Sequence, residues 1–173
     1  MAKFLFIVSS VDGHTVDISE RLAEVVRSHG HEASLVTLTE NTGIDLSEAD
    51  RVVIGASIRY GKHRPEVSRF ITENQELLEA KDGAFFSVNA VARKPEKRDA
   101  DTNPYVVKFL KSLTWRPKLV GVFGGRIHYA KYGFFDRNMI RFIMWMMKGP
   151  TDLDSDTDYT DWAAVDAFGK ALS

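Results

Sequence analysis

Short apolar runs alternate with amphipathic segments along most of the chain. The apolar runs, each bounded by polar residues or glycine, predict five strands, at residues 4–8, 33–38, 50–57, 83–89 and 119–123. Segments with apolar side chains at helical spacing predict helices, at residues 15–29, 65–80, 103–113 and 159–172. Gly30 can end the first helix, Pro65 can begin the second, and Thr160 or Asp161 is the expected N-cap of the last.

The alternation of strands and helices predicts an α/β fold. A parallel sheet with helices on both faces, doubly wound, accounts for this order within a single domain over residues 1–173. Ligands of such sheets bind outside the carboxyl ends of the strands, near the point where the strand order reverses. The loops at residues 9–15, 57–64 and 87–98 follow three of the predicted strands, and we expect the functional site there.

A long insertion separates the last predicted strand from the last helix, at about residues 126–158. Eight of the nine residues from Met139 to Met147 are apolar, and basic residues flank them, namely Arg126, Lys131, Arg137 and Lys148. The segment is too short to span a bilayer, which takes roughly 18 residues or more. It fits a core or oligomer-interface helix as well as a helix lying in a membrane interface. The candidate membrane or quinone contacts are Met139, Ile140, Phe142, Ile143, Trp145 and Met146.

An acidic run closes the insertion. Asp152, Asp154, Asp156 and Asp158 alternate with other residues, and this pattern is typical of a solvated acidic loop.

The loop at residues 9–15 has the features of a phosphate site. It joins a buried strand to a helix, whose N-terminal N–H groups favour an anion, and it carries hydroxyls and a glycine but no lysine or arginine. A phosphate monoester held by neutral donors fits it, whereas the nucleoside-triphosphate and dinucleotide glycine patterns are absent. The alternative is a plain turn with a helix cap. The candidate residues are Ser9, Ser10, Val11, Asp12, Gly13, His14 and Thr15.

Asp12 is the one feature of this loop that opposes a phosphate. A carboxylate beside a phosphate is repelled by it, so we expect the Asp12 side chain to point outward or to cap the helix.

The other two loops have features that suit a flat aromatic ligand. In the first, Tyr60 could stack on a ring, although a solvated basic loop is an equal alternative; the candidates are Ser57, Ile58, Arg59, Tyr60 and Gly61. In the second, apolar residues beside two polar ones suit the edge of a flavin ring; the candidates are Ser87, Val88, Asn89, Ala90, Val91, Ala92 and Arg93. The basic run at residues 93–98 is either a solvated face or a contact for an anionic substrate.

Composition narrows the chemistry. The chain has 173 residues, 44% of them hydrophobic, and a formal net charge of −1, so no overall field attracts nucleic acid. It has no cysteine, which excludes disulfides, thiolate metal sites and cysteine-ligated iron–sulfur clusters, and its five histidines show no metal spacing. Redox chemistry would therefore need a bound cofactor to carry the electrons.

Several segments, in collinear order, resemble the flavodoxin-like protoporphyrinogen oxidases of bacteria, the quinone-dependent protoporphyrinogen IX dehydrogenases of haem synthesis. The most specific are Ala-Ser-Ile-Arg-Tyr-Gly at 56–61 and Val-Ala-Arg-Lys-Pro-Glu-Lys-Arg at 91–98. Asp-Gly-His-Thr at 12–15, Phe-Ser-Val-Asn at 86–89, Trp-Arg-Pro at 115–117 and Tyr-Thr-Asp-Trp at 159–162 support them. The resemblance covers nearly the whole chain.

The resemblance implies a strand order of 2-1-3-4-5 and bound FMN, with residues 9–15 on its phosphate and residues 57–61 and 87–93 around the flavin. It implies removal of six electrons from protoporphyrinogen IX in three two-electron steps, with menaquinone or ubiquinone as acceptor. The flavin would be the hydride acceptor, so no side chain is assigned as catalytic. It also implies peripheral attachment to the cytoplasmic face of the bacterial inner membrane, and it leaves a monomer and a homo-oligomer both open.

The substrate is a large apolar macrocycle with two propionates. Basic side chains near the expected site could pair with these carboxylates, and the candidates are Arg59, Arg93, Lys94 and Arg98.

Three other functions remain as alternatives. They are a flavodoxin-type electron carrier, an NAD(P)H:quinone reductase, and a scaffold of the same fold without a cofactor. Basic loops around the expected site and the apolar, basic insertion are unusual for an acidic electron carrier.

Overall fold

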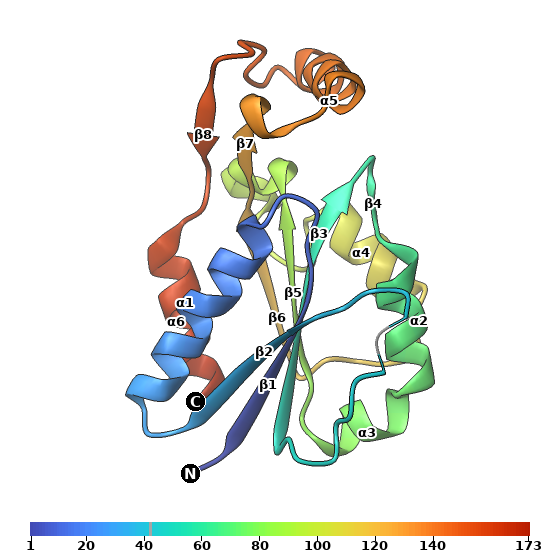
Figure 1. Ribbon diagram of the computed structural model, residues 1–173, viewed down its shortest axis with the longest axis vertical. Coiled ribbons are helices and arrows are strands. Elements are labelled where there is room, and N and C mark those ends of the chain that lie inside the picture. Colours follow the sequence, from blue (N-terminus) through green and yellow to red (C-terminus); the bar gives the residue numbers. More distant parts are fainter. Residues whose placement is uncertain (42) are drawn as a thin grey trace.

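A parallel five-stranded sheet forms the centre of the structure, a computed structural model in which residues 1–41 and 43–173 are described (Figure 1). The strands lie in the order β2-β1-β3-β5-β6, which is 2-1-3-4-5 when the parallel strands are counted along the chain. Their bounds are β1 Lys3–Ser9, β2 Glu32–Thr37, β3 Arg51–Arg59, β5 Ala84–Asn89 and β6 Leu119–Gly124. The predicted α/β class and the strand order implied by the resemblance are both confirmed.

Helices cover both faces of the sheet (Figure 1). One face carries α1 (His14–Ser28) and α6 (Trp162–Leu172), and the other carries α2 (Pro65–Glu73), α3 (Gln75–Ala80) and α4 (Pro104–Lys111). Successive side chains of a strand point to opposite faces, so neighbours such as Phe85 and Phe86 enter different cores. Because both faces of the central strands β1, β3 and β5 are largely buried, these strands are mostly apolar, and this is why they could be found in the sequence.

The helix expected at residues 65–80 is divided in two at Asn74. The side-chain amide of Asn74 donates a hydrogen bond to the carbonyl of Phe70 at 2.9 Å, and α3 begins at the next residue. Asparagine competes in this way with the backbone ladder of a helix. The expectation of one continuous helix was therefore wrong.

The region expected to be a loop at residues 57–64 is largely a hairpin. β3 continues to Arg59, turns at Tyr60 and Gly61, and pairs antiparallel with β4 (Lys62–His63). Both turn residues have positive φ, 52° and 80°, as a two-residue type I′ turn requires. The turn fixes the position of the Tyr60 side chain at the carboxyl edge of the sheet.

The insertion folds back on itself beyond the carboxyl ends of the strands (Figure 1). Its two ends pair as short antiparallel strands, β7 (Arg126–His128) and β8 (Asp156–Asp158), with Arg126 opposite Asp158. Between them lie a 3-10 turn, η3 (Tyr129–Lys131), and helix α5 (Phe134–Met146). A small core holds them together, made by Ile127, Tyr129, Tyr132 and Met144. Among the described residues, no helix combines the length and the apolar character that crossing a bilayer requires.

Candidate functional site

A pocket lies at the carboxyl edge of the sheet, with α5 along one side. The space within it is about 890 Å³, including the part open to solvent. Five described parts of the chain line it: the three loops, α4 through Tyr105, and the insertion with the glycine before it. The residues are Ser10, Asp12, His14, Thr15, Ser57, Ile58, Arg59, Tyr60, Gly61, Val88, Asn89, Ala90, Val91, Tyr105, Gly125, Arg126, Ile127, Tyr132, Ile140, Ile143, Met144 and Met147. The fold thus brings all three predicted loops and the insertion to one cavity.

Six of the predicted cofactor residues lie outside this described lining. They are Ser9, Val11, Gly13, Ser87, Ala92 and Arg93. Val11 is exposed to solvent, whereas Ser87 and Ala92 are fully buried behind the pocket wall. Gly13 serves the loop through its backbone, because its φ of 86° at the N-cap of α1 favours glycine.

Two buried hydroxyls at the strand ends have no hydrogen-bond partner within the part of the chain that the structure describes. They are the Oγ atoms of Ser9, at the end of β1, and of Ser57, near the end of β3. The neighbouring Ser10 hydroxyl accepts the N–H of Gly13 at 3.0 Å and closes the turn into α1. Since buried polar atoms are normally paired, the two unpartnered hydroxyls favour a polar ligand group near the start of α1.

Asp12 does not cap α1, so that expectation was wrong, while its partly exposed side chain lies among the residues that line the pocket. Nη2 of Arg59 donates to its carboxylate at 3.1 Å, and no side chain caps the helix. Burial raises the pKa of Asp12, and the Arg59 charge partly opposes that rise. The Arg59 guanidinium also lies over the Tyr132 ring, 5.4 Å from its centroid. Arg59 therefore neutralises the one negative charge that the loop brings to the pocket.

The tip of the β3–β4 hairpin contacts the first turn of α5. The Tyr60 hydroxyl donates to the carboxylate of Asp136, and this hydrogen bond raises the pKa of Tyr60. Arg59 lies 4.0 Å from the same carboxylate. The hairpin and the insertion thus meet at one side of the pocket.

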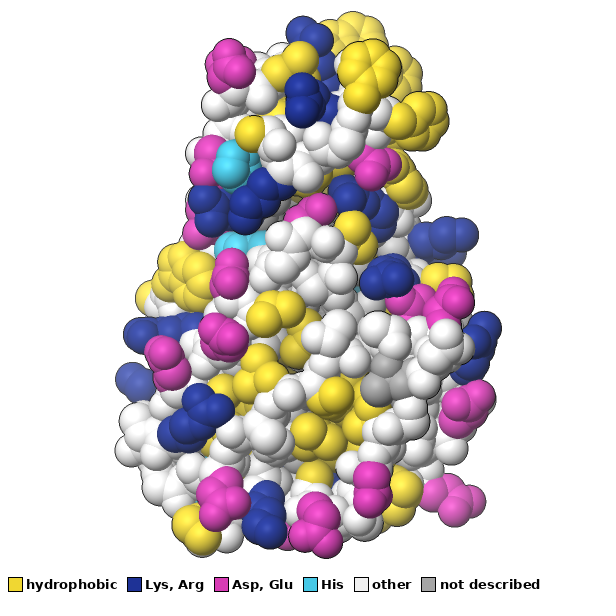
Figure 2. Space-filling model, viewed as in Figure 1, with side chains coloured by type: hydrophobic (Ala, Val, Ile, Leu, Met, Phe, Trp, Pro, Cys, Tyr) yellow, Lys and Arg dark blue, Asp and Glu magenta, His cyan; other side chains and the backbone are white. Residues whose placement is uncertain are grey.

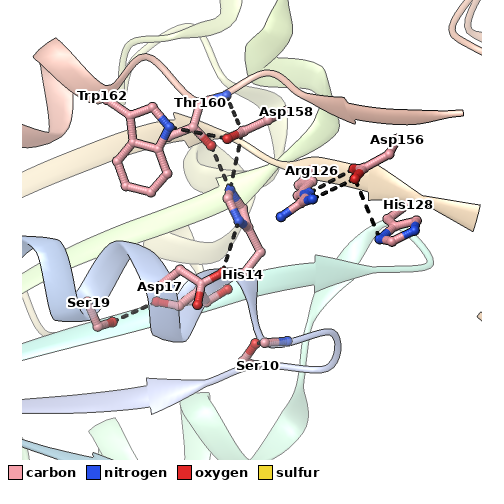
Figure 3. Close-up of polar contacts among 12 residues, drawn as sticks. Ser10, His14, Asp17, Ser19, Arg126, His128, Asp156, Asp158, Thr160 and Trp162 are labelled. Atoms are coloured by element: carbon pink, nitrogen blue, oxygen red, sulfur yellow. Dashed lines mark hydrogen bonds and ion pairs between the residues drawn. The ribbon is translucent and has the colours of Figure 1, made fainter. Parts of the chain in front are cut away.

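The base of the insertion is tied to the start of α1 through His14 (Figure 3). The Thr160 hydroxyl donates to the carbonyl of Gly124 at 2.9 Å, so its oxygen is left to accept from Nε2 of His14, 2.6 Å away. The Trp162 indole donates to Asp158, whose carboxylate is 3.5 Å from the same imidazole. Burial lowers the pKa of His14 although Asp158 opposes this.

The acidic run at the end of the insertion is more than a solvated loop. Asp156 accepts two hydrogen bonds from Arg126, at 2.7 and 2.5 Å, across the β7–β8 pair (Figure 3). Hydrogen bonding from Arg126 holds the pKa of Asp156 below its usual value. Asp156 therefore joins the two strands of the insertion, whereas Asp158 contacts His14 and Trp162, so the expectation of a purely solvated run was wrong for both.

Among the four predicted substrate cations, the described pocket lining includes only Arg59. Arg93 donates to the carbonyls of Ala90 and of Met147, at 3.1 and 2.7 Å, and so binds the end of α5. Arg98 donates to the carbonyl of Ala92 at 3.2 Å. Lys94 is exposed outside the pocket. Two of the four cations of the basic run thus hold backbone segments together.

Arg126 lines the pocket and was not among the predicted site residues. It is the first residue of the insertion and follows β6 after Gly124 and Gly125. That position was a usable signal, because it lies at the carboxyl edge where the three predicted loops meet.

Helix α5 has two apolar faces with different surroundings. Ile140 and Ile143 point into the pocket with Met144 and Met147. Met139, Phe142, Trp145 and Met146 are instead exposed, together with Phe134 and Phe135. The six predicted membrane or quinone contacts therefore divide between a pocket wall and an outer surface.

Because His63, on β4, is buried, we expect the protein to lose stability as the pH falls. Burial lowers its pKa from 6.5 to about 4. Between pH 6.5 and 4 the unfolded chain binds a proton that the folded chain does not, so we expect the free energy of unfolding to fall by up to about 3 kcal/mol across this window. Urea unfolding at several pH values measures it, and His63→Phe should flatten this part of the profile. An equally steep profile in the variant would assign the acid sensitivity to other groups.

Comparisons with known proteins agree with this architecture. A family model described as Flavodoxin domain matches residues 5–154. A flavodoxin of known structure from Streptococcus pneumoniae TIGR4 superposes with a TM-score of 0.53, over 99% of this chain and 97% of that one. The two are 15% identical, so this likeness shows the fold alone.

Two relatives of known name are similar over nearly the whole chain. A protoporphyrinogen IX dehydrogenase (quinone) from Leishmania major is 40% identical over 169 residues, which is 97% of this chain and 73% of that protein. The protein of the same name from Escherichia coli K12 is 39% identical over 171 residues, which is 99% of this chain and 94% of that protein. The chain therefore belongs to the flavodoxin-domain family and, within it, to the group of the quinone-dependent protoporphyrinogen IX dehydrogenases.

Proposed function

We propose that this protein oxidises protoporphyrinogen IX to protoporphyrin IX with bound FMN, and passes the electrons to a quinone. The full-length similarity to dehydrogenases of that name carries the proposal, and the pocket supports it. In each of three steps, two electrons and two protons leave the macrocycle, and one quinone is reduced to a quinol. This activity places the protein in haem biosynthesis, as an oxidoreductase.

A flavin cofactor follows from the family, and the loop at the start of α1 favours FMN among flavins. The loop offers hydroxyls and helix N–H groups but no lysine or arginine, which suits a single phosphate. The Oγ atoms of Ser9 and Ser57 are buried without a partner, and each would donate to the phosphate by rotating toward the pocket, which Ser57 lines. Tyr60, Ala90 and Val91 would border the ring. When bound, the flavin supplies the two-electron acceptor that the chain's own residues lack.

The cofactor assignment predicts opposite effects on two properties in Ser9→Ala and Ser57→Ala. Each change removes a buried hydroxyl without a partner, so the cofactor-free protein should be as stable as the wild type or slightly more stable. FMN affinity should fall by about tenfold, the value of one hydrogen bond. Urea unfolding and FMN fluorescence quenching measure the two properties.

Ser19→Ala is the matched control for these two changes. The Ser19 hydroxyl is also buried, but it already donates to the carbonyl of Thr15 at 2.8 Å. Its loss should cost stability and leave FMN affinity near the wild-type value. Unchanged FMN affinity in both Ser9→Ala and Ser57→Ala would remove these hydroxyls from the phosphate site.

For the substrate, we assign the inner face of α5 and two arginines. Ile140, Ile143 and Met144 offer an apolar wall for the macrocycle. Arg59 and Arg126 line the same pocket and could pair with the propionates by exchanging their present partners, Asp12 and Asp156.

The outer face of α5 supports a peripheral membrane contact. Phe134, Phe135 and Trp145 are 83%, 72% and 68% exposed, and hydrophobic side chains gather at this end of the molecule (Figure 2). Arg141 and Lys148 are exposed on the same segment, as anionic headgroups would require. We propose that this face docks on the cytoplasmic side of the membrane that holds the quinone. A homo-oligomer contact through the same face is the alternative.

One anaerobic experiment tests the activity. The FMN-loaded protein is mixed with protoporphyrinogen IX while flavin absorbance and porphyrin fluorescence are followed together. We expect the flavin to bleach as porphyrin fluorescence rises, and to recolour when menadione or ubiquinone-1 is added. Free FMN at the same concentration is the control. A flavin that stays oxidised, but is bleached quickly by NADPH, would instead support an NAD(P)H:quinone reductase.

A further inference from the structure

We infer that His63 is a positioning residue for the flavin, acting through a buried chain of polar side chains that runs from β4 to the pocket wall. The chain consists of His63, Ser87, Asn89 and Asn103, all of them buried. His63 is outside the described pocket lining, so it would act on the cofactor through its neighbours. The inference rests on the flavin site proposed above and adds a determinant of ring binding.

The chain of contacts is continuous. Nε2 of His63 lies 2.8 Å from Oγ of Ser87, and the side-chain amide of Asn89 donates to the same oxygen at 3.1 Å. Oδ1 of Asn89 accepts from the side-chain amide of Asn103 at 2.9 Å and from the backbone N–H of Ala92 at 3.1 Å. Because Ser87 accepts from Asn89, its hydroxyl can donate to a neutral His63 ring. The ring is neutral at physiological pH, since burial lowers its pKa to about 4.

The last contact of this chain reaches the pocket. The N–H of Ala92 belongs to the 3-10 turn η1 (Ala90–Arg93), and Asn89 is the residue that caps this turn. Ala90 and Val91 in the turn line the pocket beside Asn89 itself. The orientation of one amide therefore sets the backbone at the edge where the flavin ring is proposed to lie.

The surroundings of His63 leave few other partners for this amide chain. The imidazole packs against Phe109, with ring centroids 4.4 Å apart, and against Phe85 at 5.6 Å. In such apolar surroundings, the imidazole is the acceptor for the Ser87 hydroxyl proton. A buried hydroxyl that loses its acceptor destabilises the folded state. Removing the imidazole would free Ser87 to rotate toward Asn89 and disturb the cap of η1.

The test uses binding of two flavins to the full-length protein. His63→Phe keeps an aromatic ring between Phe85 and Phe109 but removes the hydrogen bond. We expect it to weaken both FMN and riboflavin by about tenfold, because the affected wall faces the ring that the two ligands share. Ser9→Ala, at the proposed phosphate end, should weaken FMN and leave riboflavin unchanged. Ser87→Ala breaks the same chain at its next member and should behave as His63→Phe does.

Two further variants separate positioning from packing. His63→Gln retains an amide that can bond Ser87, so it should recover most of the lost affinity. His31→Phe is the matched control: this imidazole also accepts one hydrogen bond, from the backbone N–H of Ala2 at 3.1 Å, and packs on Phe4, but it lies at the opposite end of β1. It should leave both affinities unchanged.

The outcomes separate this inference from the proposed function. Riboflavin affinity at the wild-type level in His63→Phe and Ser87→Ala would overturn the inference, as would a Gln variant as weak as the Phe variant. If the wild-type protein binds neither flavin, the proposed cofactor itself is wrong. The free energy of unfolding of each cofactor-free variant is measured alongside, so that a loss of folding is not taken for a loss of binding.

Discussion

Replacing Gly55 with valine is expected to destabilise the fold by about 4 kcal/mol or more, and FMN binding should be lost with it. Gly55 lies in the middle of β3, paired with Val8 of β1 on one side and with Phe86 of β5 on the other. A Cβ atom at this position would stand 2.2 Å from Cζ of Phe86, far inside contact distance. The measurement is the urea midpoint of the cofactor-free protein, together with its FMN affinity.

The Phe86 ring has little room to move away. It is fully buried and packs against the rings of Phe123 and Phe168, with centroids 5.7 and 6.3 Å away. β3 is also the strand that carries Ser57 and Arg59 into the pocket, so a shift of β3 displaces the site.

A compensating pair tests this physical cause directly. Gly55→Ala alone should cost about 3 kcal/mol, and Phe86→Leu alone should cost stability through the smaller side chain. Together they should cost clearly less than the sum, because the leucine leaves space for the new methyl group. Strictly additive losses would mean that the contact with Phe86 is not the reason for glycine at this position.

The sheet was the part of the structure that the sequence predicted best. Its central strands are largely buried on both faces, so they appear as short, mostly apolar runs such as Phe4–Val8. The helix break at Asn74 was not predicted, because it depends on a single hydrogen bond from the Asn74 side chain to the carbonyl of Phe70. The hairpin at Tyr60 and Gly61 was missed although tyrosine–glycine can form such a turn, since its partner strand has only two residues.

The site was predicted as a set of loops, but their internal contacts were not. The rule that ligands bind at the carboxyl ends of parallel strands placed all three loops correctly at one pocket. The basic run could not be interpreted in the same way. A sequence shows the charge of Arg93 but not that the guanidinium reaches the carbonyl of Met147, 54 positions away along the chain. Likewise, the partner of Asp156 is fixed by the β7–β8 pairing.

The two apolar faces of α5 could not be distinguished from the sequence either. Ile143 and Trp145 are both apolar and only two positions apart, and in the sequence they carry the same signal. In the structure, Ile143 lines the pocket and Trp145 faces outward. Only the docking of the helix on the pocket assigns one face to the substrate and leaves the other for an external surface.

The triple replacement Phe135→Ser, Phe142→Ser and Trp145→Ser should abolish vesicle association, lowering the apparent affinity about a thousandfold. These side chains are 72%, 54% and 68% exposed, and each would contribute about 1 to 1.5 kcal/mol in a membrane interface. Sedimentation with vesicles containing anionic phospholipid measures the effect. FMN affinity should stay at the wild-type value, because the described pocket lining contains none of the three.

Leu77→Ser is the matched control for this replacement. Leu77 is 46% exposed on α3, at the end of the molecule away from α5 (Figure 1), so its loss should leave vesicle association unchanged. Raising the salt concentration should weaken the wild-type association if Arg141 and Lys148 contact headgroups, because salt screens exposed charges. The membrane proposal would be contradicted if the wild-type protein does not bind vesicles but forms a dimer, and the triple variant is a monomer. This face would then be an interface between two copies. Either result explains why so many aromatic side chains on one helix remain outside the core.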